Sequence, residues 1–500
     1  MRSLAALTLF ALVATVAPGR AADLSIVNDL PKPTAGGVPW TAHDVALLRK
    51  DLAKILAGST LRGAQVGLLA IDTTRGTTLV SQNADEAFQP ASNFKLLVGS
   101  TALQNLGTNF AFRTDVLAAG TIAGGTLTGD LYLGGGGDAR LTAADLDAAA
   151  AAVAAAGITT VTGQVIGDAS RYDAERYPGG WDFDDMAYYY APVVSALCLE
   201  ENVLHVHLAP GEAAGGPARL IVTPATTAFT LENDLVTGPA GSADTSEIER
   251  PWDAPRTVRI TGNYPLGAKT SGDIHPAVPD PAEYAVDVFA KRLAQHGVSV
   301  AGGEQTGGVA PAGATVEWTH DAEPMEQYMA DFWWPSDNLI GELFLKEVGA
   351  TAGGLPGTDA KGAAAERVFL KSIGVDPGTV SISDGSGLSN YDRIPPRALV
   401  AILQHDWNGP NRALVLNALP MSGVSGTLRN AYKGTPAERN VVAKTGSISH
   451  VRTISGYIRT KRHGAVTFSF LVNDWVDPSP QASEHLAVLR AAVLSRFVTD

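Results

Sequence analysis

The pattern of hydrophobic and polar positions differs between the ends of the chain and its middle. Apolar residues three or four positions apart predict helices at residues 41–55, 282–296, 363–373 and 481–498. Strand patterns occupy residues 65–72, 77–82, 453–460 and 465–473. From about residue 112 to residue 255, short strand-like runs with glycine turns surround one alanine-rich helix at 145–156. Because both ends share a helix-and-strand texture that the middle lacks, we predict one domain interrupted by a large insertion.

Composition narrows the class of protein. The 500 residues are 45% hydrophobic and 18% charged, which is enough apolar chain for several large cores. A formal net charge of -14 argues against a general nucleic-acid binder, which needs a basic face to meet phosphates. The single cysteine, Cys198, excludes an internal disulfide and any multi-cysteine metal site. His205 and His207 alternate on a strand-like run without a third ligand nearby in sequence, so we predict neither a metal nor a cofactor.

The first residues have the pattern of a secretory signal peptide. Arg2 precedes an apolar stretch from Leu4 to Ala17, which is shorter than the roughly 20 residues that a membrane span needs. Small residues follow, and we expect cleavage after Ala21, so that residues 1–21 are a signal peptide. No later segment is apolar enough to span a bilayer. The predicted location is therefore the periplasm or the medium, while association with a membrane surface and the oligomeric state stay open.

A first short motif suggests nucleophilic catalysis. Ser92 and Lys95 stand three residues apart at a predicted helix start after Pro90, a spacing that puts both side chains on one helical face. A serine hydroxyl needs a base to take its proton, and lysine can serve if burial and a second cation lower its pKa. Lys444 is a candidate for that second cation. Taken alone, an S-x-x-K tetrad is more often a helix start with a solvated lysine.

Two further motifs supply groups that a serine enzyme needs. Ser336-Asp337-Asn338 is a polar break that offers a hydroxyl for proton relay and an amide for a substrate carbonyl. Lys444-Thr445-Gly446 follows an apolar run and predicts an edge strand, where a cation and a hydroxyl can bind a carboxylate. Gly446 would let a substrate backbone approach closely. The backbone N–H groups of Ser447 and Ser92 could then form an oxyanion hole.

The order S-x-x-K, S-D-N, K-T-G is that of penicillin-recognising serine enzymes. About 240 residues separate Lys95 from Ser336, which is far more than a β-lactamase-type helical domain needs. About 108 residues separate Ser336 from Lys444. The chain resembles the D-alanyl-D-alanine carboxypeptidase/endopeptidase family, the class C low-molecular-mass penicillin-binding proteins. Other matching segments are PASNFKLL, LGGGGDARLT, GGWDFDD, YAPVVSALCLEENV, SDGSGLSNYDRIPP and SGVSGTLRN.

The resemblance implies a mixed α/β (α+β) fold. Its penicillin-recognising, transpeptidase-like domain has an antiparallel sheet flanked by helices, and two smaller, mostly β domains are inserted between S-x-x-K and S-D-N. The expected boundaries are 22–112 and 321–500 for the catalytic domain, 113–136 and 257–320 for inserted domain II, and 137–256 for inserted domain III. The implied partners are peptidoglycan peptides and β-lactam antibiotics.

The resemblance also implies roles for the motif residues. Ser92 would be the acylated nucleophile and Lys95 its proton acceptor, although Ser336 stays open as the working base. Ser336 and Asn338 would line one wall for proton transfer and amide binding. A second set would handle the substrate's terminal carboxylate: Lys444 by ordering the site electrostatically, Gly446 by giving room, and Thr445 and Ser447 by direct contact.

Four further residues are candidates outside the motifs. Members of the family often carry a basic residue after D-G-S-G-L-S, but this chain has Asn390. Asp184 or Asp185 could instead meet an amino group on the peptide. Asp384 and Ser386 could frame the floor of the site, although an ordinary Asp-Gly turn explains them equally well.

Three functions are compatible with these motifs. The first is a D-alanyl-D-alanine carboxypeptidase and endopeptidase acting on peptidoglycan through an acyl-enzyme on Ser92. The second is a β-lactamase, for which the long insertion and the lack of a clearly placed deacylating glutamate are unfavourable. The third is a catalytically weak wall-binding module, which the intact motifs disfavour.

Overall fold

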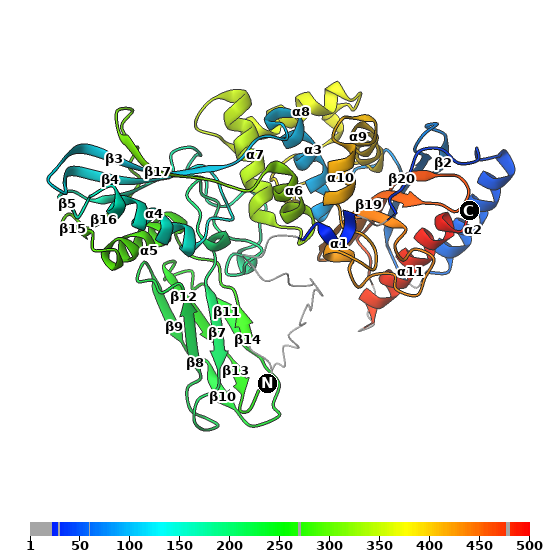
Figure 1. Cartoon of the computed structure of the whole chain (residues 1–500). Helices are drawn as coiled ribbons and strands as arrows, with labels where there is room; N and C mark the ends of the chain where they lie inside the picture. Colours follow the sequence, from blue (N-terminus) through cyan, green and yellow to red (C-terminus); the bar gives the residue numbers. More distant parts are fainter. Residues whose placement is uncertain (1–22, 29–30, 60, 269–271, 477–480) are drawn as a thin grey trace. The chain divides into compact units, whose positions relative to one another are not determined.

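The computed structural model describes residues 23–28, 31–59, 61–268, 272–476 and 481–500. The chain forms two compact units (Figure 1). The first unit comprises residues 1–104, 326–337 and 366–500, and the second comprises residues 105–325 and 338–365. The first unit is thus assembled from both ends of the chain, as the pattern of elements predicts. The predicted signal peptide lies outside the described residues.

The first unit is built on a five-stranded antiparallel sheet in the order β18-β19-β20-β1-β2. Strand β20 is buried along its whole length because it is central, whereas β18 lies at an edge. This edge position agrees with the strand expected around the K-T-G motif. The strands are β1 (Gln65–Asp72), β2 (Thr78–Gln82), β18 (Val441–Ile448), β19 (Val451–Arg459) and β20 (Ala465–Asn473).

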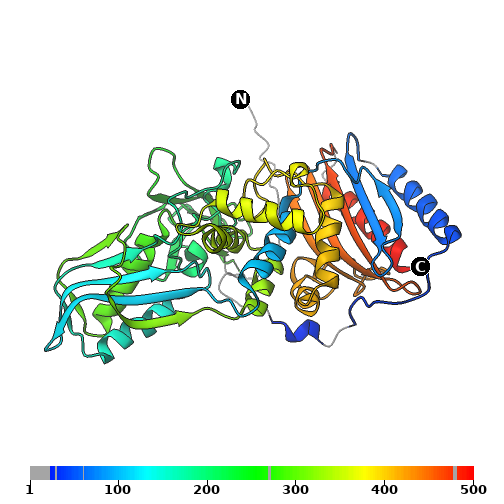
Figure 2. The same cartoon turned by 90° about the horizontal axis from the view of Figure 1, so that it is seen from above.

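Helices cover both faces of this sheet (Figure 2). Helix α2 (Ala42–Ala57) begins at a capping box made by Thr41 and Asp44, and it packs with α11 (Ala482–Val498) in one apolar core against the sheet. Helix α9 (Pro396–Asn408) lies on the opposite face, where the Tyr457 hydroxyl of β19 donates to its Leu403 carbonyl at 2.7 Å. The unit also contains α1 (Ser25–Asn28), η1 (Ala91–Phe94), most of α3 (Lys95–Leu106), most of α6 (Met325–Trp333), the second half of α8 (Asp359–Ser372), η4 (Pro377–Thr379), α10 (Arg412–Ala418) and η5 (Gly426–Leu428).

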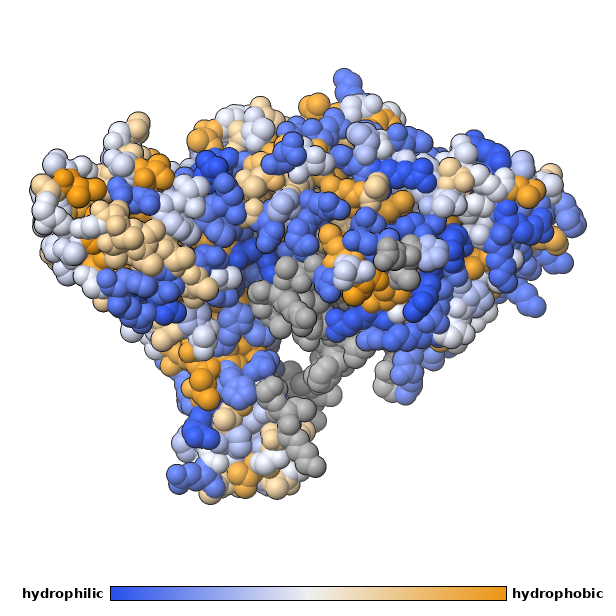
Figure 3. Space-filling view, viewed as in Figure 1, coloured by the Kyte–Doolittle hydropathy of each residue, from blue (hydrophilic) through white to orange (hydrophobic). Residues whose placement is uncertain are grey.

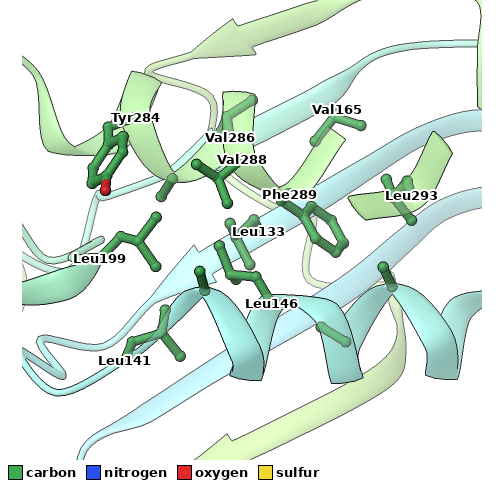
Figure 4. Close-up of a cluster of buried hydrophobic side chains, with 14 of the residues drawn as sticks. Leu133, Leu141, Leu146, Val165, Leu199, Tyr284, Val286, Val288, Phe289 and Leu293 are labelled. Carbon is green, nitrogen blue, oxygen red and sulfur yellow. The ribbon is translucent and has the colours of Figure 1, made fainter. Parts of the chain in front are cut away.

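The core of the second unit lies between a seven-stranded mixed sheet and two helices (Figure 4). Leu146 of α4 (Ala143–Ala155) and Phe289 of α5 (Pro281–Gln295) are fully buried against Leu133 and Val165 of the sheet. The strands are β3 (Arg113–Ala123), β4 (Thr126–Gly135), β5 (Thr160–Val161), β6 (Val165–Asp168), β15 (Ser299–Val300), β16 (Glu304–Thr306) and β17 (Thr315–Asp321).

Three small sheets and a long helix complete the second unit. Helix α7 (Asn338–Gly353) starts two residues after Ser336 and is almost wholly buried over its first three turns. The small sheets contain β7 (His205–Ala209), β8 (Arg219–Thr223), β9 (Thr230–Asn233), β10 (Val236–Gly238), β11 (Glu247–Glu249), β12 (Thr257–Thr261), β13 (Asn263–Pro265) and β14 (Gly272–Ile274), with η2 (Phe183–Asp185) and η3 (Glu200–Asn202) before them. The boundary between two separate inserted domains stays a prediction.

The face of the molecule seen in Figure 3 carries both hydrophilic and hydrophobic residues. Hydrophilic residues predominate around α2 on the face seen in Figure 3, and hydrophobic residues form smaller groups. Within the described residues, no helix combines the length and the apolar character needed to cross a bilayer.

Candidate active site

The nucleophile candidate Ser92 lies in a tight turn at the entrance to a buried helix. Residues 91–94 form the 3₁₀ turn η1, and α3 continues directly from Lys95. Lys95 is completely buried, and its Nζ donates a hydrogen bond to Ser92 Oγ at 3.0 Å. Ala91 has a φ of 46°, a left-handed conformation that is costly for a residue with a side chain. The local chain therefore holds the serine hydroxyl and the lysine amine together at the expense of backbone strain.

A second hydrogen bond holds the amine of Lys95 in place. Its Nζ donates to the backbone carbonyl of Ser386 at 2.6 Å. The Ser386 hydroxyl in turn donates to Asp384 Oδ2 at 2.9 Å, and both residues are fully buried. Gly387 has a φ of 77°, and a Cβ there would lie only 2.1 Å from the Ala91 carbonyl oxygen. The D-G-S-G turn is thus pressed against the turn that carries Ser92.

The carboxylate of Asp384 holds the D-G-S-G turn in place. It accepts backbone N–H bonds from Gly387 at 2.6 Å, from Ser389 at 2.7 Å and from Ser386 at 3.1 Å. A carboxylate that collects several N–H donors fixes a loop firmly. Asp384 therefore acts on the site through the Ser386 carbonyl, and both of these sequence candidates lie beside Lys95.

Lys444 connects the K-T-G motif with the S-D-N motif. Its Nζ donates to Ser336 Oγ at 2.8 Å and to the Thr445 carbonyl at 2.8 Å. Ser336 has a φ of 67°, so its loop too is held in a left-handed conformation. Burial holds the pKa of Lys444 well below its ordinary value, and the positive charge that Lys95 carries when it is protonated lowers this pKa further. The two lysines therefore share one site.

The edge strand β18 lies beside the turn that carries Ser92. A Cβ at Gly446 would stand 3.0 Å from the Ser92 backbone nitrogen and 2.2 Å from Thr453 Oγ1, so only glycine fits without displacing its neighbours. Thr453 Oγ1 donates to the Pro90 carbonyl at 2.7 Å and accepts from Asn93 Nδ2 at 2.6 Å. These bonds join β19 to the same turn.

The remaining residues of the K-T-G region differ in exposure. Thr445 is half-buried, and Ser447 is exposed. Both belong to β18, where Thr445 is paired with Ile454 and Ser447 with Arg452 of β19. The structure thus brings Ser92, Lys95, Ser336, Lys444 and the K-T-G strand together within the first unit.

Three sequence candidates lie in the second unit. Asn338 is the first residue of α7, and its Nδ2 donates to the Tyr190 carbonyl at 2.6 Å. The Tyr190 hydroxyl donates to Asp185 Oδ1 at 2.9 Å. Burial raises the pKa of Asp185, although the hydrogen bond from Tyr190 opposes this shift. Asp184 is exposed.

Two residues at the site were not singled out from the sequence. Thr453 carries no motif that could reveal its bonds to the Ser92 turn. Thr427 lies in the segment SGVSGTLRN, and its Oγ1 is 2.7 Å from Thr445 Oγ1. The segment is one of those that match the family, but nothing in its sequence indicates which strand it contacts.

The three motifs bring two hydroxyl–amine pairs together. The Ser92 hydroxyl contacts the Lys95 amine, and the Ser336 hydroxyl contacts the Lys444 amine next to the edge strand β18. A hydroxyl beside an amine base is the arrangement that nucleophilic catalysis requires. Among the described residues, no group of three or more His, Cys, Asp or Glu side chains is placed to hold a metal ion.

Comparison with known proteins decides the family. The model of the D-Ala-D-Ala carboxypeptidase 3 (S13) family matches residues 48–493. This chain belongs to that family. The resemblance drawn from the three motifs is therefore confirmed. A D-alanyl-D-alanine carboxypeptidase of Actinomadura sp. (strain R39), 34% identical over 491 residues, is matched over 95% of this chain and 90% of its own length.

Solved structures show that this S13 family member has the expected fold. The crystal structure of penicillin binding protein 4 (dacB) from Haemophilus influenzae matches with a TM-score of 0.79 at 20% identity, covering 88% of this chain and 97% of that chain. A structure of the same protein complexed with a novel β-lactam matches with a TM-score of 0.75 at 20% identity, covering 90% of this chain and 100% of that chain. The predicted α+β architecture, with an antiparallel sheet, flanking helices and a large insertion, is confirmed.

Proposed function

We propose that this chain is a serine D-alanyl-D-alanine carboxypeptidase and D,D-endopeptidase that acts on peptidoglycan peptides through an acyl-enzyme on Ser92. The observation that carries the proposal is the 3.0 Å hydrogen bond between Lys95 Nζ and Ser92 Oγ. A buried amine held against a serine hydroxyl is the arrangement that activates a weak nucleophile. Membership of the S13 family and the 34% identity to the Actinomadura carboxypeptidase support the same reaction.

In the first step, Ser92 Oγ attacks the carbonyl carbon of the peptide bond before a terminal D-alanine. The hydroxyl proton passes to an uncharged amine at Lys95, or to the Ser336 oxygen while the Ser336 hydroxyl gives its own proton to the departing amine, and the Ser92 oxygen forms an ester with the acyl group. The C–N bond breaks, and the departing D-alanine amine takes up the proton. The hydrogen bond that Lys444 Nζ donates to the Ser336 oxygen favours release of the Ser336 proton, which suits Ser336 to protonate the departing amine.

In the second step, water hydrolyses the ester. The water oxygen adds to the acyl carbon, and one water proton passes through the same groups to Ser92 Oγ. The bond between the acyl carbon and Ser92 Oγ breaks, so that the peptide leaves as a carboxylic acid and Ser92 regains its hydroxyl. A cross-linked peptide carries the scissile bond after a D-alanine as well, so endopeptidase action needs the same chemistry on a larger substrate. A penicillin would acylate Ser92 by opening its lactam ring, which keeps the leaving amine attached.

Binding of the substrate's end is assigned to strand β18. Thr445 and Ser447 would donate hydrogen bonds to the terminal carboxylate, and Lys444 would supply positive charge beneath them. The close approach of Gly446 to the Ser92 backbone nitrogen supports an oxyanion hole formed by the N–H groups of Ser92 and Ser447. Asn338 would bind a substrate amide, and Asp184 or Asp185 would meet an amino group of the stem peptide.

Two mass-spectrometric experiments test the nucleophile. The intact protein should gain the mass of one benzylpenicillin, and peptide mapping should place it on Ser92. Ser92→Ala should remove the adduct. Ser81→Ala is the matched control, because Ser81 is an exposed serine of the similar sequence Ser81-Gln82-Asn83, and it should leave the adduct intact. An adduct that persists in Ser92→Ala refutes the assignment.

The reaction is tested with peptides. Release of D-alanine from an acyl-D-alanyl-D-alanine peptide supports the carboxypeptidase, and cleavage of a D-centred cross-linked dimer supports the endopeptidase. Rapid acylation followed by a stalled ester is expected with benzylpenicillin. Sustained penicillin turnover without D-alanine release would instead identify a β-lactamase.

A further inference from the structure

A pair of hydroxyl groups lies next to the lysine of the K-T-G motif. Thr427 Oγ1 in η5 is 2.7 Å from Thr445 Oγ1 in β18, and either oxygen can be the donor. Both side chains are half-buried, so the pair is shielded on one side without being sealed from solvent. The residue following Lys444 therefore has a hydroxyl partner from a segment that carries none of the three motifs.

Thr427 is itself held in place by the chain that leads to Ser336. Its backbone N–H donates to the Trp334 carbonyl at 2.9 Å. The preceding Gly426 has a φ of 55°, and a Cβ there would lie 2.8 Å from the same carbonyl oxygen. A bulkier residue could not bring the two segments this close. Thr427 is thus fixed both to the loop of Ser336 and to the side chain of Thr445.

The hydrogen-bonding capacity of the pair gives Thr427 its role. Each hydroxyl has one proton to donate and two lone pairs that can accept, while an ionised carboxylate can only accept. When Thr445 donates its single proton to a carboxylate, its 2.7 Å contact with Thr427 survives only if Thr427 becomes the donor. Thr427 then donates its proton to a lone pair of Thr445 Oγ1, and the Thr445 proton remains directed at the ligand.

We propose that Thr427 is a positioning residue that donates to Thr445 Oγ1 and thereby directs the Thr445 hydroxyl proton at the terminal carboxylate of the substrate. This inference rests on the proposed function, because it uses the assignment of Thr445 to the carboxylate. It adds a residue outside the three motifs that selects peptides with a free carboxyl end.

Binding measurements in the Ser92→Ala background test the inference without chemistry. The probes are an N-acetylated peptide ending in D-alanyl-D-alanine and its C-terminal amide, with dissociation constants measured by calorimetry. Thr427→Val removes the hydroxyl at nearly constant size, and it should weaken binding of the acid about tenfold while changing the amide less than about twofold, since hydrogen bonds to charged groups are the stronger ones. Thr427→Ser keeps a hydroxyl and should bind the acid as the parent does.

A double-mutant cycle separates action through Thr445 from an independent effect. In a Thr445→Val background, adding Thr427→Val should cause no further loss of acid binding, because the group it positions is gone. Equal weakening of acid and amide, or losses that multiply, would overturn the inference. Thr427→Ala provides the same test should the valine variant unfold. A parent that binds acid and amide equally well would instead overturn the carboxylate site of the proposed function.

Discussion

Two buried lysines, one in each unit, show how differently the protein uses the same side chain. Lys444 in the first unit is 0% exposed, and Lys346 in the second is 1% exposed. Within the described part of the chain Lys444 forms no salt bridge, and its Nζ donates to a hydroxyl and to a carbonyl. Lys346 Nζ lies 2.7 Å from Asp173 and 2.9 Å from Asp359.

The pKa values of the two lysines shift in opposite directions. Burial lowers the pKa of Lys444, and the charge of Lys95 lowers it further. Burial also acts to lower the pKa of Lys346, but the attraction of Asp359 and Asp173 outweighs this and raises it. Equal burial therefore gives opposite outcomes, and the partner decides between them.

Two buried carboxyl groups, one in each unit, repeat this contrast. In the first unit, Asp406 is 6% exposed and accepts a hydrogen bond from Ser100 Oγ at 2.8 Å, and burial raises its pKa to about 7. In the second unit, Glu347 is bound by Arg171 through two hydrogen bonds and by the Tyr172 hydroxyl at 3.0 Å. Lys346 and Glu347 of the second unit are thus neutralised by opposite charges, whereas Lys444 and Asp406 of the first unit have neutral hydrogen-bond partners.

The difference between charged and neutral partners separates buried groups that stabilise the fold from buried groups that remain available to a ligand. A buried ion pair satisfies both of its charges, and removing one partner leaves the other unpaired. A buried lysine with neutral partners holds its proton less firmly, and in its protonated form it can attract an anionic ligand, at a cost in stability. Such a cost is typical of sites that are arranged for function.

The largest expected effect comes from removing the cation of the first unit. Lys444→Met should slow the acylation of Ser92 by benzylpenicillin about a thousandfold, because a preorganised charge beside the reacting carbonyl is lost. The free energy of unfolding should not fall, since no partner charge is left unpaired. Stopped-flow acylation and urea unfolding measure the two quantities, and a variant that acylates normally would contradict the role given to Lys444.

Asp406 provides a pH-dependent test. The pKa of an aspartate in the unfolded chain is about 3.8, whereas burial raises the pKa of the folded carboxyl to about 7. The folded state thus binds more protons between these values, so this group makes the free energy of unfolding fall as the pH rises from 4 to 7. Asp406→Asn should remove a decrease of about 4 kcal/mol between pH 4 and pH 8, measured by urea unfolding. Parallel curves for parent and variant would show that the carboxyl is not held neutral.

Breaking the ion pair of the second unit should mainly affect stability. Lys346→Met leaves Asp173 and Asp359 without their shared cation and should lower the free energy of unfolding by about 3 kcal/mol. Benzylpenicillin acylation per folded molecule should stay within about twofold of the parent, which is the reverse of the Lys444→Met result. Similar losses of activity in both variants would remove the distinction between the two lysines.

The smallest effect is expected at an exposed pair of the second unit. Arg113 Nε lies 2.7 Å from Asp321 Oδ1, with both side chains more than half exposed. Solvent screens such a pair, so Arg113→Gln should leave the urea midpoint unchanged within error. A clear shift would show that surface charges also stabilise this unit.

Much of the first unit could be predicted from local patterns. The strand at 65–72 and the helix ending at 498 are where their periodicity places them. Helix α9, Pro396–Asn408, was not predicted, although a proline at the first helical position is compatible with a helix. Its importance comes from the sheet face that it covers, and this contact joins residues far apart in the chain.

The site was predictable only as far as its motifs are local. Ser92 and Lys95 meet because one helical turn separates them, and this relation can be derived from spacing alone. The contact of Thr427 with Thr445, and that of the Ser386 carbonyl with Lys95, depend on loops whose neighbours no periodicity reveals.

By itself, the sequence determined the family, the order of the three motifs and the interrupted layout of the catalytic domain, because these depend on residue identity and short-range spacing. Tertiary structure alone decided that Lys444 would meet a serine 108 residues away, and that Lys346 would meet an aspartate 173 residues away. The physical reason is that the pKa of a buried lysine depends on the charges that folding brings within a few ångströms of it, whatever their distance along the chain.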